Sequence, residues 1–171
     1  MDIRGPHVIL RPIRQGDAER LAEILQTPEV ARWWTGYDQG RVEAEFLVEE
    51  PDVRVYGIEL QDRLVGLIQV TDEPTPDFRH ASLDLFLDPA VQGRGVGPEA
   101  IRILARHLFE HDGHHRLTID PAADNERAIR AYAKVGFKPI GRMRQYQRFP
   151  DGTWQDGLLM DLLADELEDD R

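Results

Sequence analysis

The sequence predicts a mixed α/β domain, and three neighbouring features support this prediction. Residues 80–88 (HASLDLFLD) alternate with a period of two, which is typical of a strand. A glycine-rich segment follows, and an amphipathic helix then runs to about residue 111. Residues 116–120 form a second strand directly after that helix. Because one helix joins the two strands, they should run parallel in one sheet, with a right-handed crossover.

Two helices and three strands are predicted before residue 80. Residues 7–13 (HVILRPI) form a short strand, and a helix opens at Gly16-Asp17 with an apolar face and closes at Pro28. A second helix covers 38–50. The other predicted elements are a loop over 29–36, strands over 53–60 and 64–71 joined by a turn at Gln61-Asp62-Arg63, and a loop over 72–77.

The C-terminal part adds one helix and two strands. Asn125 is a good N-cap for a helix over 126–135, and Gly136 is its C-cap. Strands over 137–147 and 154–163 are joined through the turn sequence Pro150-Asp151-Gly152. The acidic tail over 164–171 is either a helix end or a frayed terminus. With neither linker nor repeat, residues 1–171 are expected to form a single domain.

Composition excludes several classes of function. The 32 acidic and 21 basic side chains give a net charge of −11, which disfavours nucleic acids and anionic membranes and permits a cationic partner. The absence of cysteine excludes a thiol nucleophile and Cys-based zinc sites. No apolar run is long enough to span a membrane, so a cytoplasmic protein is expected. His111, His114 and His115 lack further ligands, so no metal site is predicted.

The glycine-rich segment is the first sign of chemistry. Three glycines stand between a strand and a helix in Gln92-Gly93-Arg94-Gly95-Val96-Gly97-Pro98. Glycines let backbone N–H groups approach an anion, and the helix N-terminus adds its positive dipole. The segment matches neither the Walker A pattern nor G-x-G-x-x-G. Taken alone, it is either a pyrophosphate cradle or a flexible connector.

A second segment, Asn125 to Phe137 with the terminal Gly-Phe, follows the second parallel strand. Together with Gln92-x-x-Gly95-x-Gly97 it resembles the GCN5-related N-acetyltransferase (GNAT) superfamily. The resemblance implies an acetyl-CoA-dependent enzyme with a mixed sheet of about seven strands, splayed between 80–88 and 116–120 and flanked by about four helices. The cofactor contacts that it implies are Leu85, Phe86, Leu87, Gln92, Gly93, Arg94, Gly95, Val96, Gly97, Pro98, Asn125, Ala128 and Tyr132.

The same resemblance implies catalytic roles. Backbone amides of Leu85 and Leu87 would polarise the thioester carbonyl, since fixed N–H donors stabilise charge that develops on oxygen. Tyr132 would protonate the departing thiolate. Tyr132 could instead be an ordinary half-buried aromatic residue on an amphipathic helix.

Four further residues bear on the acceptor amine. They are the pair Trp33-Trp34, Asp84 in the strand and Asp120 before Pro121. Their pattern resembles that of the aminoglycoside 6′-N-acetyltransferases. Asp84 or Asp120 would bind a cationic amine and take its proton, and a tryptophan would stack on a sugar ring. The tryptophans could equally belong to the core, and Asp120 could cap the next turn.

Other acceptors remain open. Residues 137–163 and the opening Leu10-Arg11-Pro12-Ile13 look more like acetyltransferases of the ribosomal-protein N-terminal type. A polyamine-like or siderophore-type amine is a third candidate, and an acyl-CoA-binding module without turnover is the alternative of another class. The resemblance is compatible with a monomer or a homodimer. Asp72, Glu73 and Asp77 are expected at the rim of the site.

Overall fold

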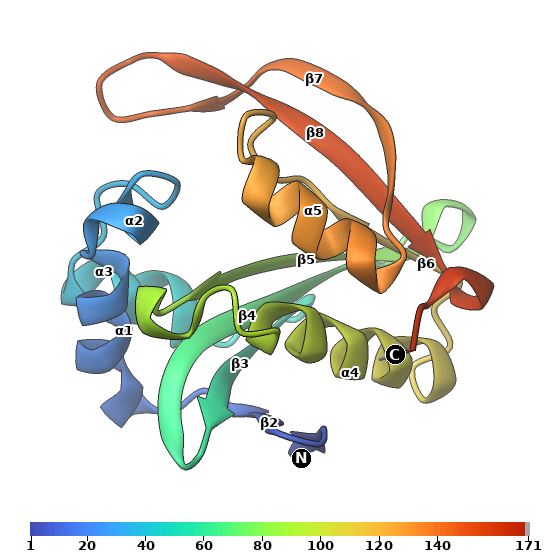
Figure 1. Cartoon of the computed structure of the whole chain (residues 1–171), viewed down its shortest axis with the longest axis horizontal. Helices are drawn as coiled ribbons and strands as arrows, with labels where there is room; N and C mark the ends of the chain where they lie inside the picture. The colour runs from blue at the N-terminus through green and yellow to red at the C-terminus, as the bar shows by residue number, and fades with distance from the viewer. Residues whose placement is uncertain (170–171) are drawn as a thin grey trace.

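The computed structural model describes residues 1–169 and contains one mixed sheet with helices on both faces (Figure 1). The strands are β1 (Ile3–Arg4), β2 (Val8–Pro12), β3 (Val53–Leu60), β4 (Arg63–Glu73), β5 (His80–Leu87), β6 (Arg116–Ile119), β7 (Lys138–Arg148) and β8 (Trp154–Leu163). The helices are α1 (Ala18–Leu25), α2 (Pro28–Ala31), α3 (Gln39–Phe46), α4 (Val96–Glu110) and α5 (Glu126–Val135). Among the strands of this described part, the order is β1-β2-β3-β4-β5-β6-β8-β7.

The predicted fold class is confirmed. Strands β5 and β6 run parallel, as the helical crossover requires, and the other neighbouring strands in the described sheet are antiparallel. The strand over 53–60 and the helix over 126–135 have the predicted bounds. Gln61 and Asp62 have φ of +51° and +60° and form a tight two-residue turn between β3 and β4. The turn was predicted there over Gln61-Asp62-Arg63, but Arg63 already belongs to β4.

The structure differs from the prediction in elements that are very short or that extend further than expected. The two-residue β1 makes the sheet eight-stranded rather than about seven-stranded, and the single turn α2 falls in the predicted loop over 29–36. Elements this short leave no periodicity in the sequence. Strand β4 continues to Glu73, into the predicted loop over 72–77, because Asp72 and Glu73 still pair with β5. The acidic tail begins as a 3-10 turn over Ala164–Glu166, and residues 170–171 lie outside the described residues.

Two hydrophobic clusters sandwich the sheet. The larger one joins α4 and α5 to one face, with Ile68 of β4 and Leu83 of β5 buried in it. The smaller one packs α1, α2 and α3 against the other face, with Leu67 and Phe86 at its centre. Because neighbouring residues of a strand point to opposite faces, Asp84 lies on the same face of β5 as Phe86.

The sheet splays at β5 and β6, as the resemblance implied. On β5, only Ala81, Ser82 and Leu83 pair with β6. Beyond Leu83 the two strands separate, so β5 keeps a partner only on the β4 side. Figure 1 shows α5 above this part of the sheet, and the β7–β8 hairpin arches over α5.

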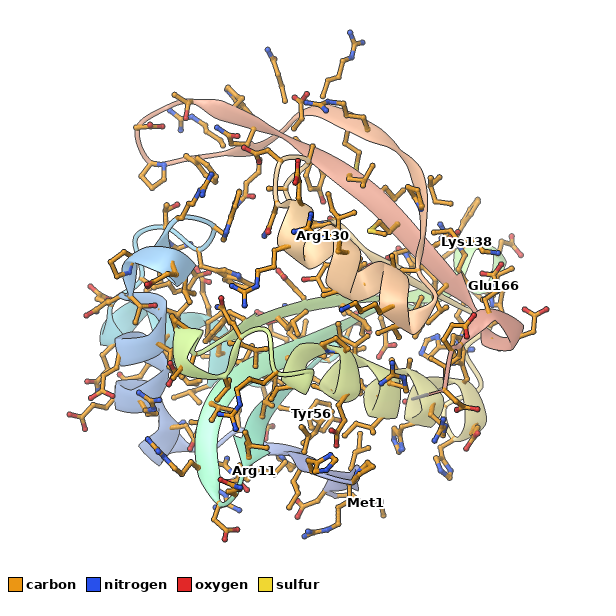
Figure 2. All side chains as sticks on the ribbon, in the orientation of Figure 1. Met1, Arg11, Tyr56, Arg130, Lys138 and Glu166 are labelled. Atoms are coloured by element: carbon orange, nitrogen blue, oxygen red, sulfur yellow. The ribbon has the colours of Figure 1, made fainter. Side chains whose placement is uncertain are left out.

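Ion pairs tie the ends of the sheet to the helices. Arg11 on β2, labelled in Figure 2, donates to both carboxylate oxygens of Asp17 at 2.7 and 2.8 Å, just before α1. Lys138 on β7 and Glu166 after β8 lie side by side at the far end of the hairpin. In the described residues, no helix is long and apolar enough to cross a membrane, and no group of three acidic or histidine side chains could hold a metal ion.

Candidate active site

A cleft of about 1520 Å³ opens where β5 separates from β6. Its walls come from β5, the α2–α3 region, the loop before α4, helix α5 and the tip of the β7–β8 hairpin. Small-molecule pockets usually measure roughly 300–1,000 Å³. The cleft is therefore large enough for two ligands side by side.

The edge of β5 presents backbone donors to this cleft. The Asp88 N–H donates to Val65 O on β4 at 2.7 Å. Because the backbone groups of a strand alternate between its two edges, the N–H groups of Leu85 and Leu87 point away from β4, toward the splay. Gln92 Nε2 donates to Leu87 O at 2.9 Å, which fits this direction. These are the two residues whose amides were predicted to contact the thioester.

Asp84 lies in the cleft wall, reached by solvent through the opening and enclosed by protein elsewhere. Its carboxylate accepts a hydrogen bond from the Leu85 N–H at 3.0 Å. The surrounding protein raises the pKa of Asp84 to about 7, and the nearby charge of Asp120 adds to the rise. Asp84 therefore changes protonation close to neutral pH, as a proton acceptor in catalysis should.

Asp120 follows β6 and lines the same cleft. The hydroxyl of Tyr146 on β7 donates to Asp120 Oδ2 at 2.5 Å. Burial raises the pKa of Asp120, and the Tyr146 hydrogen bond opposes that rise. The two carboxylates predicted from the sequence thus lie close enough to influence each other, but their hydrogen-bond partners differ.

Tyr132 lies on α5, half-buried in the cleft wall. Enclosure by protein, with the charges of Asp84 and Asp120, raises the pKa of its phenol. The phenol is therefore protonated at neutral pH, which is the state that a proton donor needs. Its ring also packs against the larger hydrophobic cluster, so the catalytic and structural interpretations of Tyr132 are compatible.

The glycine-rich loop has the backbone of an anion cradle. Gly93 and Gly95 have φ of +75° and +81°, a conformation that favours glycine, and Gly95 is the N-cap of α4. Arg94 and Arg127 border the cleft here with exposed guanidinium groups. Arg127 Nη1 donates to Gln92 Oε1 at 3.0 Å, so Gln92 links the end of β5 to α5. This set of groups fits the pyrophosphate of an acyl-CoA.

Some of the other predicted cofactor residues line the cleft, and the side chains of others are buried in the hydrophobic clusters. Gly97, Pro98, Asn125 and Ala128 line the cleft, and Asn125 also caps α5 by accepting the Ala128 N–H at 3.3 Å. The Val96 side chain is buried in the larger cluster instead, which leaves only its backbone for a ligand. Phe86 borders the cleft and also fills the smaller cluster.

The position of the tryptophan pair is compatible with both interpretations that the sequence left open. Trp34 packs edge-on against Phe86, with ring centroids 5.2 Å apart, and so belongs to the smaller cluster as well as to the cleft wall. Trp33 faces the cleft with the Arg32 guanidinium 4.6 Å from its ring centroid.

One expectation was wrong: Asp72, Glu73 and Asp77 do not line the cleft. Asp72 instead pairs with Arg54 at 3.1 Å and with the buried His114 at 2.9 Å, near the other end of β5.

Several cleft residues were not predicted from the sequence. Tyr146, Arg148, Phe149 and Pro150 come from the β7–β8 hairpin, and Tyr37 and Arg41 come from the α2–α3 region. The hairpin tip also meets that region: a Cβ on Gly36 would lie 3.7 Å from Pro150 Cγ. No local pattern marks these residues, because the hairpin reaches the cleft only through the bend of β7.

Comparisons with known proteins give the family of the chain. The family model for the acetyltransferase (GNAT) domain matches residues 7–138. The aminoglycoside N(6′)-acetyltransferase type 1 of Klebsiella pneumoniae is 28% identical over 164 residues, covering 85% of this chain and 79% of that protein. The N-alpha-acetyltransferase RimI of Mycobacterium tuberculosis is 35% identical over 74 residues, covering 43% of this chain and 44% of that protein.

An uncharacterized protein of Mycobacterium leprae is 36% identical over 91 residues, and this chain spans only 24% of its length. Among solved structures, the spermidine N-acetyltransferase of Vibrio cholerae in complex with CoA and spermine superposes with a TM-score of 0.80 at 21% identity, over 95% of this chain and 98% of that one. This structural likeness shows the fold. With the family model matching most of the chain and the cleft offering a cradle that fits the cofactor, the chain belongs to the GNAT acetyltransferase family and is an acetyl-CoA-dependent N-acetyltransferase.

Proposed function

We propose that this enzyme acetylates a primary amine of a small cationic molecule, with the 6′-amine of an aminoglycoside antibiotic as the first candidate. The observation that carries the proposal is the pair of carboxylates, Asp84 and Asp120, beside Tyr132 in one cleft. Two carboxylates bind a substrate that carries several ammonium groups. Antibiotic resistance would be the physiological consequence.

The proposed reaction is direct transfer in a ternary complex. Acetyl-CoA supplies the acetyl group as a thioester. An ammonium group cannot attack, so a cleft carboxylate first takes one proton from nitrogen and passes it to solvent. The N–C bond then forms and the C–S bond breaks. Tyr132 gives its proton to the departing sulfur, and the second proton of the nitrogen restores the Tyr132 hydroxyl.

Backbone donors of β5 support the same step. Charge develops on the carbonyl oxygen while nitrogen attacks, and N–H groups fixed at the splayed edge would stabilise it. The Leu87 amide is available for this, and the Leu85 amide would contribute by exchanging the Asp84 carboxylate for the thioester oxygen. Since the chain has no cysteine, no thiol acyl-enzyme is expected.

The approach of the hairpin tip to the α2–α3 region favours a small acceptor. Pro150 Cγ lies 3.7 Å from the position that a Cβ on Gly36 would take, and Thr35, Tyr37 and Pro150 all line the cleft. A polypeptide that passes through the site would need an open groove there. The relative from Klebsiella pneumoniae, matched over most of its length and named for an aminoglycoside, agrees with this choice.

Release of CoA thiol from acetyl-CoA tests the proposal against its alternatives. The acceptors are kanamycin, sisomicin, spermidine and an alanine-terminated peptide. We expect turnover with the aminoglycosides and none with the peptide. Turnover of the peptide alone would indicate an N-terminal acetyltransferase, and turnover of spermidine alone a polyamine enzyme. Acetyl-CoA binding without turnover of any acceptor would indicate a binding module.

A further inference from the structure

Strand β7 is interrupted where it passes the cleft. Its pairing with β8 shifts register between Met143 and Gln147, and Gln145 has a φ of +50°. Asp156 on β8 holds this bulge: its carboxylate accepts the Gln145 N–H at 2.8 Å and Arg142 Nε at 2.7 Å. Bulges redirect side chains, and this one turns the next residue, Tyr146, to the cleft.

A glycine on β8 makes room for the Tyr146 ring. A Cβ on Gly157 of β8 would be 2.9 Å from Tyr146 Cδ1, so the glycine makes room for the ring. Strand β8 is also tied to the segment after Asp120, because Leu158 N–H donates to Pro121 O and Ala123 N–H donates to Asp156 O, both at 2.8 Å. The phenol and the Asp120 carboxylate are therefore held on one frame, 2.5 Å apart.

The carboxylates of Asp84 and Asp120 differ in their hydrogen-bond donors. Asp120 accepts a hydrogen bond from the Tyr146 hydroxyl, whereas within residues 1–169 the carboxylate of Asp84 accepts one only from the backbone N–H of Leu85. A carboxylate that accepts a hydroxyl donor is stabilised as an anion and is the poorer proton acceptor. Asp84 keeps oxygen lone pairs free on the cleft side.

We propose that Tyr146 is a positioning residue for acetyl transfer: its hydroxyl holds Asp120 as a fixed anion that anchors the substrate's ammonium groups, which leaves Asp84 to accept the proton of the reacting amine. The inference rests on the proposed function and assigns different roles to carboxylates that the sequence left interchangeable. The raised pKa of Asp84, and the opposing effect of Tyr146 on the pKa of Asp120, agree with it.

The variant Tyr146→Phe tests the proposal, because it removes the hydroxyl and keeps the ring. Without that donor the pKa of Asp120 rises further, so Asp120 takes up a proton as the pH falls and the anchor is lost. We expect kcat/KM for kanamycin (or for spermidine, if only that amine is acetylated) to drop about tenfold at pH 6 and to recover to within about threefold of wild type at pH 9. The KM for the amine should rise more than the KM for acetyl-CoA.

Two further variants complete the experiment. Tyr56→Phe removes a phenol from the core that does not line the cleft, and should keep the wild-type pH profile. Asp156→Ala releases the bulge without touching the cleft, and should move the profile in the same direction as Tyr146→Phe. This second route keeps the test valid if Tyr146→Phe folds poorly, which thermal unfolding would detect.

The outcomes separate the two proposals. If the wild-type enzyme acetylates neither kanamycin nor spermidine, the proposed function fails before Tyr146 is tested. If the wild-type enzyme is active but Tyr146→Phe and Asp156→Ala keep its pH profile and its KM for the amine, the role of Tyr146 is overturned. The assignment is also overturned if Asp120→Asn abolishes the acidic limb of the profile while Asp84→Asn retains it.

Discussion

Asp84, the proposed proton acceptor, has a predicted cost in stability. It stands among leucines and phenylalanine in the C-terminal half of β5 and faces the cleft, where enclosure by protein raises its pKa to about 7. The raised pKa means that the folded chain binds this proton more tightly than the unfolded chain. Stability is therefore lost as the pH rises from about 4, the ordinary pKa of Asp, to about 7.

Replacing Asp84 by asparagine should change activity and stability in opposite directions. Without its proton acceptor the enzyme should lose at least about 100-fold in kcat/KM, and the loss of activity below about pH 7 should disappear from the profile. At pH 8 the variant should unfold at a higher temperature than the wild type, since asparagine carries no charge for the surrounding protein to disfavour. Steady-state kinetics and calorimetry measure the two effects.

The exposed Asp77, outside the cleft, offers the matched control. Asp77→Asn should leave both the pH profile and the unfolding temperature as in the wild type. An Asp84→Asn variant that keeps the acidic limb, or that is less stable than the wild type at pH 8, would contradict the role given to Asp84.

At the scale of the element, α5 shows what local signals determine and where they stop. Asn125 and Gly136 mark its two ends in the sequence, and both cap it in the structure. Gly136 does more than end the helix, because it packs against the chain after β8. Its φ is +116°, and a Cβ there would lie 2.2 Å from Glu166 O, a backbone atom.

Gly136→Ala should therefore destabilise the chain more than the same change at another left-handed glycine. Gly113 has a φ of +69° with nothing within 4 Å of a Cβ, so Gly113→Ala adds only backbone strain, roughly 1–2 kcal/mol. For Gly136→Ala we expect at least about 3 kcal/mol, because Glu166 must also move. Urea unfolding measures both losses, and equal losses would show that the Glu166 contact has no effect.

At the scale of the whole molecule, the cleft carries both signs of charge. The chain has a net charge of −11, yet Arg94, Arg127 and Arg130 border the cleft at the glycine-rich loop and α5, the last labelled on α5 in Figure 2. Asp84 and Asp120 line the same cleft, and Arg41 and Arg148 border it as well. Under the proposed function, the anionic cofactor would meet the arginines of the loop and α5, and the cationic acceptor would meet the two carboxylates.

Higher ionic strength should therefore weaken the attraction between the enzyme and a cationic acceptor. Between about 0.01 M and about 0.15 M salt the screening length falls from about 30 Å to about 8 Å, so the attraction of the whole chain for a polycation is largely lost. We expect the KM for kanamycin to rise several-fold over this range, and the KM for an acceptor with a single amine to rise less. A KM for kanamycin that is constant or falls would show that the net charge does not attract the acceptor.

The sequence by itself determined the elements and the cofactor loop, because capping, alternation and glycine spacing act within a few residues of chain. It also singled out Asp84, Asp120 and Tyr132, whose roles stay predictions while their common cleft is observed. Only the tertiary structure decided which carboxylate holds a hydroxyl and which stays free. That difference depends on a bulge that brings Tyr146 to Asp120, 26 positions away. Such contacts are fixed by strand register and by packing between distant segments, neither of which has a local pattern.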